Sequence, residues 1–257
     1  MIDNHTRESW YITHRKEVIS RFKNGKKVPD KREVINSPSN KYKLEINRVS
    51  FKKRKREYVF SYVNVFGKDK IISRIHRNDS DFPHLFVETD SGDYLIYAED
   101  VQSRTILDLN TGKYINYISE KASRELEFRW KKMVMSPNNK YLMVEGLVRH
   151  KPKDVMDYRE IRFYDVQNLN KLPYKEVGER IVFPFDSFIS WEGDDKYVLS
   201  IREEYSKEKD MPIRDMSKEE RSECLANEGD HSIKKIFYRM SLLEELNREE
   251  VFYEWIE

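Results

Sequence analysis

One short pattern occurs four times in this chain: a turn of small polar residues, a tyrosine, and then an apolar run with the character of a β-strand. The tyrosines are Tyr42, Tyr94, Tyr141 and Tyr197, and they lie 52, 47 and 56 residues apart. Ser-Pro, Gly-Asp, Asn-Asn and Asp-Asp in the turns favour reversal of the chain into a β-hairpin. A repeated unit of this size buries its hydrophobic face by stacking on its neighbours. The repeat therefore favours an array of similar small sheets.

Each hairpin lies inside a unit of four strand-like runs. The run before the turn falls at 33–35, 84–87, 132–135 and 188–191. The runs that follow the tyrosine strand fall at 58–66 and 70–75, 105–109 and 113–118, 161–166 and 174–177, and 235–240 and 250–255. Four strands per unit, repeated four times, are typical of a β-propeller. We therefore predict an all-β, small propeller-like array of about four four-stranded blades.

The third unit carries a family resemblance. Its hairpin at 136–144 resembles the Ser-Pro-Asp-Gly-Lys-Tyr hairpin of WD40 and TolB-type propellers, and its strand at 161–166 resembles their third strand. The Gly-His and Trp-Asp pairs of a WD40 repeat are absent. The resemblance covers most of residues 33–257. It implies the fold and a binding role, and it assigns no functional residue.

The expected layout is one domain over 1–257. We place an extra strand and a basic loop at 1–32 and the blades at 33–77, 78–123, 124–180 and 181–257. Residues 8–21 predict a strand or a helix that either closes the ring with the last blade or covers an open edge. Residues 202–232 form an insertion in the last unit, where a capping box at 217–220 predicts a short helix near 217–227. A closed ring of four, half-rings paired in a dimer, and packed sheets without closure all remain open.

Charge is unevenly distributed along the chain. Residues 1–77 hold 21 Lys and Arg against 8 Asp and Glu, whereas the whole chain has a net charge of only +2. This asymmetry favours either a polyanionic partner for the first part or electrostatic association between copies of the chain.

Two basic segments are the sharpest local features. The first lies at 52–56, at the expected hairpin tip of the first blade, and the second lies at 23–32, in an expected polar loop that contains a proline. The candidate polyanion-binding residues are Lys23, Lys26, Lys27, Lys31, Arg32, Lys52, Lys53, Arg54, Lys55 and Arg56. Clustered cations bind phosphates with release of counterions. The run at 52–56 also fits a nuclear-localisation signal, or a solvated loop in a lysine-rich protein.

Catalytic and metal-binding motifs are missing from the sequence. There is no G-x-S-x-G elbow, the six histidines show no i, i+4 pair, and the acidic turn at 192–195 lacks the spacing of a calcium loop. We expect no catalytic residues, no metal and no cofactor. We interpret the four repeated tyrosines as packing residues between blades, rather than as a stacking platform for bases.

These observations favour a non-catalytic scaffold that binds a protein partner or a second copy of itself. The alternative is a nucleic-acid-binding protein that uses 23–32 and 52–56, and an enzyme with a site in a central channel is the third hypothesis. The single Cys224, the absence of a signal-like start and the absence of a long apolar run predict an intracellular protein, cytoplasmic or nuclear, without a membrane partner.

Overall fold

The computed structural model of the protein describes residues 4–53, 55–100, 103–118, 126–150, 157–182, 187–226, 231–244 and 249–256. They form four antiparallel sheets, two α-helices and one 3-10 turn. The prediction of an all-β array of about four blades is confirmed. None of the helices within the described ranges is both long and apolar enough to cross a membrane.

Each sheet uses strands that are consecutive in the chain. Sheet 1 contains β1 (Lys26–Asn36), β2 (Tyr42–Lys53), β3 (Arg56–Gly67) and β4 (Lys70–Arg77), and sheet 2 contains β5 (His84–Thr89), β6 (Gly92–Tyr97), β7 (Ser103–Asp108) and β8 (Tyr114–Ile118). Sheet 3 contains β9 (Leu126–Met135), β10 (Tyr141–His150), β11 (Tyr158–Asp165) and β12 (Lys175–Val182), and sheet 4 contains β13 (Ser187–Trp191), β14 (Lys196–Ser206), β16 (His231–Ser241) and β17 (Glu249–Ile256). The short β15 (Met211–Pro212) pairs with β14.

The first and third repeats form the same turn, down to individual hydrogen bonds. The backbone N–H of Ser37 donates to the carbonyl of Tyr42, and the N–H of Ser136 donates to that of Tyr141. The serine hydroxyl in turn accepts from the tyrosine N–H in both hairpins. Asn40 and Asn139 take positive φ values of 60° and 58°, a region that asparagine tolerates better than most residues. The Ser-Pro-x-Asn-Lys-Tyr sequence therefore sets this turn locally.

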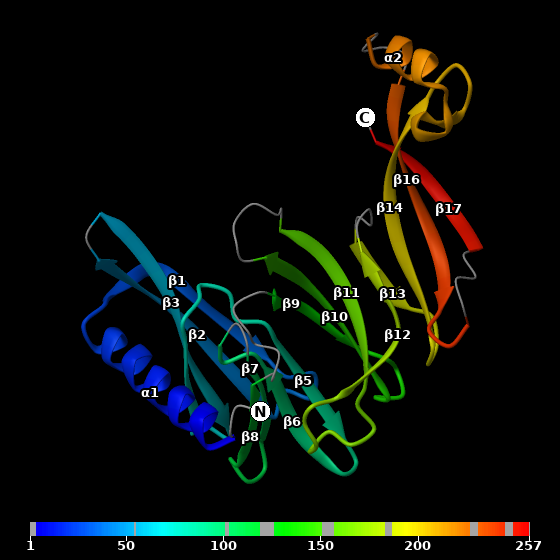
Figure 1. Ribbon diagram of the computed structural model, residues 1–257. Coiled ribbons are helices and arrows are strands. Elements are labelled where there is room, and N and C mark those ends of the chain that lie inside the picture. The colour runs from blue at the N-terminus through cyan, green and yellow to red at the C-terminus, as the bar shows by residue number, and fades with distance from the viewer. Residues whose placement is uncertain are drawn as a thin grey trace.

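The core lies between the sheets, which pack face to face in chain order. One cluster joins Leu44 and Val63 of sheet 1 to Leu95 of sheet 2. A second cluster joins sheets 2 and 3, and a third joins Met143 and Phe163 of sheet 3 to sheet 4. Figure 1 shows the result as an arc, with sheet 1 at one end and sheet 4 at the other. No described strand of sheet 1 pairs with one of sheet 4.

The fourth repeat is shifted by one residue relative to the others. Tyr42, Tyr94 and Tyr141 belong to the clusters that join their own sheet to the following one. Tyr197 instead packs against Phe163 of the preceding sheet, with ring centroids 4.6 Å apart. The turn before Tyr197 is one residue shorter. The backbone N–H of Glu192 donates to the carbonyl of Lys196, four residues later, whereas that of Ser136 donates to the carbonyl of Tyr141, five residues later. The expectation that all four tyrosines are equivalent is wrong for Tyr197, and Lys196 takes that position.

The N-terminal segment is a helix, α1 (Asn4–Lys23), and the expectation of an extra strand there is wrong. The ring of Phe22 packs against the rings of Phe60 and Tyr62 on β3 and His76 on β4. Burial, together with the nearby charge of Arg15, lowers the pKa of His76, which favours the neutral ring in this contact. The helix covers the outward face of sheet 1 (Figure 1).

The segment at 23–32 is not the loop that the sequence suggested, since β1 begins at Lys26. Pro29 is tolerated there because β1 is an edge strand, and the pairing with β2 shifts register between Lys27 and Arg32.

The insertion in sheet 4 does contain the expected helix, α2 (Lys218–Ala226), preceded by the 3-10 turn η1 (Ile213–Asp215). Ser217 and Glu220 form its capping box: the N–H of Glu220 donates to the Ser217 hydroxyl, and the N–H of Ser217 donates to the Glu220 carboxylate. The outer parts of 202–232 are strand rather than loop, because β14 continues to Ser206 and β16 begins at His231.

Candidate polyanion-binding surface

The β2–β3 hairpin extends beyond the strands that flank it. The last pair between β1 and β2 is Lys26 with Ser50, and the last pair between β3 and β4 is Ser61 with Arg77. Past these points β2 and β3 pair only with each other, through Lys53 and Arg56. The projecting end lies at the upper left of Figure 1.

The same register brings the two basic segments of the sequence together. Lys26 and Lys27 start β1 beside Ser50 and Val49, only a few residues from the hairpin tip. Lys23 ends α1 immediately before them, and Gly25 lies against Val49 at this junction. Three elements thus place cations at one end of sheet 1. We call this group of six residues the basic tip: Lys23, Lys26, Lys27, Lys52, Lys55 and Arg56.

All six side chains of the basic tip are exposed. Within the described part of the chain, none of them makes an ion pair. Glu57, which pairs with Lys52 across the hairpin, is the one acidic residue between positions 46 and 68. The tip therefore presents six cations, and Glu57 is the one acidic side chain on the hairpin beside them.

The other predicted residues are placed differently. Arg32 donates to Glu45 on the neighbouring strand at 2.7 Å, which neutralises its charge. Lys31 and Lys53 are described in their backbone alone, and Arg54 lies outside the described residues.

Sequence reasoning missed Tyr58, which is 44% exposed at the base of the tip. It pairs with Phe51 across the hairpin, next to the Lys52–Glu57 pair. Its position beside the basic run was a visible signal, because an aromatic ring next to cations suits contact with bases or sugars.

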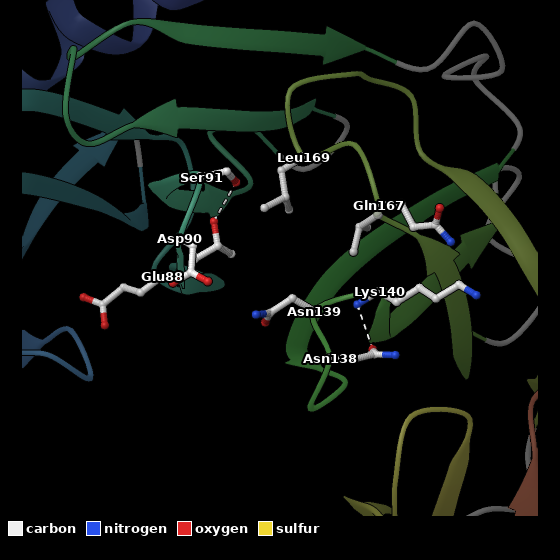
Figure 2. A pocket seen from close by; sticks show the side chains of 10 residues that line it. Glu88, Asp90, Ser91, Asn138, Asn139, Lys140, Gln167 and Leu169 are labelled. Atoms are coloured by element: carbon white, nitrogen blue, oxygen red, sulfur yellow. Dashed lines mark hydrogen bonds between the residues drawn. The ribbon is translucent and has the colours of Figure 1, made fainter.

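A cleft of about 640 Å³ opens between sheets 2 and 3. Figure 2 shows it between the β5–β6 turn, with Ser91, and the β9–β10 turn, with Asn138 and Asn139. Glu88 points away from it, toward sheet 1, where the backbone and hydroxyl of Ser39 donate to its carboxylate. The cleft offers amides and hydroxyls for hydrogen bonds, together with the charged groups of Asp90 and Lys140.

The described residues hold no cluster of three or more His, Cys, Asp or Glu side chains that could ligate a metal. Cys224 is buried against Ile213 and Met216 in the insertion. The four repeated tyrosines are all buried. The Tyr42 hydroxyl donates to Asp93 of sheet 2 at 2.9 Å. Their interpretation as packing residues is confirmed.

The sequence is similar to that of a viral protein. Over 222 residues the chain is 25% identical to a protein of Acanthamoeba polyphaga mimivirus described as "Uncharacterized protein R762", and the aligned region covers 84% of each protein. No family model matches the chain. The relative carries no role that could be transferred to this protein.

Proposed function

We propose that this protein is a non-catalytic binding protein with a propeller-like scaffold, and that its basic tip binds nucleic acid. The observation that carries the proposal is the convergence of six exposed cations from α1, β1 and the β2–β3 hairpin. Phosphate backbones bind such clusters through counterion release, without a preformed pocket. Anchoring of the tip to a stable sheet fixes the cations at a constant spacing.

The test is fluorescence anisotropy with a labelled 20-base-pair DNA at several salt concentrations. With about six phosphate contacts, affinity should fall by about 10³ between 50 and 200 mM salt. The double variant Lys52→Glu with Arg56→Glu should weaken binding at least tenfold. The slope of log affinity against log salt concentration should also decrease, by the amount that about two phosphate contacts contribute.

The matched control is Lys207→Glu with Lys218→Glu, in the insertion of sheet 4. These side chains are also exposed, and the net charge changes by the same amount. Affinity should stay near that of the unmodified protein. Loss of affinity as large as in the tip variant would mean that only net charge matters, and the assignment to the basic tip would be wrong.

Association with a protein partner or with a second copy is the second candidate. The edge strand β17 favours it, because Phe252, Tyr253 and Trp255 are each about half exposed. Aromatic residues are enriched at the centres of protein interfaces. Light scattering at low and high salt tests it: a salt-sensitive dimer supports association of the basic sheet 1 with acidic parts of another copy, and a monomer at every salt concentration opposes self-association.

A further inference from the structure

The projecting hairpin has the shape of a ribbon that fits a groove. Past Ser50 it continues for three residue pairs, from Phe51–Tyr58 to Lys53–Arg56. At about 3.3 Å per residue, this is a projection of about 10 Å, only two strands wide. The major groove of B-form DNA is about 12 Å wide and about 8.5 Å deep, and it admits a two-stranded ribbon.

The cations of the basic tip lie on both faces of this ribbon. Directly paired residues of an antiparallel sheet share a face, and successive residues alternate. Lys52 shares a face with Ser50 and its partner Lys26. Arg56 and Lys27 lie on the opposite face, that of Phe60, which α1 covers further down the sheet.

Cations on both faces of the hairpin favour insertion into a groove over contact of one face with the surface of a nucleic acid. A ribbon inside a groove has a phosphate backbone on each side, so cations on both faces find partners. A surface that lies flat on a nucleic acid needs its cations on one face only. The few exposed aromatic rings at the tip also give little support for stacking along a single strand.

We infer, on the basis of the proposed function, that the β2–β3 hairpin inserts into the major groove of duplex DNA. The ligand class is B-form duplex DNA rather than duplex RNA, because the A-form major groove is too narrow and deep for side chains to reach its bases. Lys52 and Arg56 then face phosphates on opposite walls of the groove, and Tyr58 lies at its entrance.

The experiment compares a DNA duplex, an RNA duplex and a DNA single strand of the same sequence at one salt concentration. We expect the DNA duplex to bind at least tenfold more tightly than the other two. Methylation of guanine N7, an atom of the major groove, should be reduced where the protein binds. In the Lys52→Glu, Arg56→Glu variant this protection should disappear.

A gain-of-affinity variant guards against loss by misfolding. Glu57→Gln removes the acidic group from the ribbon and should tighten binding to the DNA duplex several-fold. Glu204→Gln, at an exposed site on β14, should leave it unchanged.

The outcomes separate the two proposals. Equal affinity for the DNA and RNA duplexes, or binding without N7 protection, overturns insertion and leaves nucleic-acid binding intact. Absence of binding to all three ligands overturns both.

Discussion

The outer faces of the first and last sheets of the array differ in what covers them. At sheet 1, aromatic residues point outward, and α1 covers them through Phe22. At sheet 4, Lys196 occupies the position that a buried tyrosine holds in the other sheets, and no described helix covers that face. A terminal unit of a repeat array needs a polar outer face or an added element, because it has no next neighbour. Sheet 1 has an added element, and the outer face of sheet 4 is mixed, since Lys196 and Ser200 share it with the stacked rings of Phe237 and Phe252.

The difference also separates scaffold from binding surface. The covering helix ends at Lys23 and thereby adds to the basic tip, so that one element both closes the core and extends the proposed site. The insertion of sheet 4 has its own small cluster around Ile213, Met216 and Cys224. Changes there should affect the rest of the molecule little.

The largest effect is expected when the lysine that sheet 4 carries at this position replaces the tyrosine of an inner sheet. Tyr141→Lys places an ammonium group among the buried residues between sheets 3 and 4. Because a buried, unpaired charge is strongly disfavoured, we expect a loss of more than about 4 kcal/mol of unfolding free energy. Chemical denaturation followed by circular dichroism measures it. A variant as stable as the natural chain would show that Tyr141 does not have to be buried.

A smaller loss should follow removal of the contact that covers sheet 1. Phe22→Ala deletes the ring that packs on Phe60, Tyr62 and His76. We expect a loss of about 3 kcal/mol and increased binding of a hydrophobic dye as the outward face becomes exposed. Ile12→Ala on the same helix, at a side chain that is 45% exposed, is the control and should change little.

The contact between sheets 1 and 2 should depend on pH at the alkaline end. Burial, together with the hydrogen bond to Asp93, raises the pKa of Tyr42 to about 12. The unfolded chain loses this proton near pH 10 and the folded chain only near pH 12, so this contribution to stability falls as pH rises between these values. Tyr42→Phe should cost about 1 kcal/mol at neutral pH and reduce the alkaline fall. An alkaline profile unchanged from that of the natural chain would contradict this role.

The smallest effect is expected when the lysine of sheet 4 is replaced by the tyrosine of the other sheets. Lys196→Tyr restores the repeat residue on a face that no sheet follows, so stability should change by less than about 0.5 kcal/mol. Thermal denaturation measures this, and sizing shows whether the added ring promotes association. A large loss of stability would mean that Lys196 is required for packing.

Much of this architecture was readable from the sequence. The turn sequences at 37–42 and 136–141 specify the same local hydrogen bonds, and alternating apolar residues specify the strands on either side. The capping box of α2 was equally local, since Ser217 and Glu220 bond within one helical turn. Such features depend on neighbours within a few residues, so a linear pattern records them.

The basic segment at 52–56 was visible in the chain, but its meeting with 26–27 was not. It depends on strand pairing between Lys26 and Ser50, with a register shift after Lys27. The residues before Arg32 look like a loop because they are polar and contain a proline, and only an edge position in a sheet makes them a strand.

The sequence by itself determined the number of units, their strand order and their local turns, because these depend on contacts close in the chain. Tertiary structure alone decided that Tyr197 faces backward, that α1 covers sheet 1 and that the cations converge at the basic tip. The physical reason is that a one-residue change in a turn moves every following side chain to the other face of its strand. Which face is then buried depends on sheets contributed by distant parts of the chain.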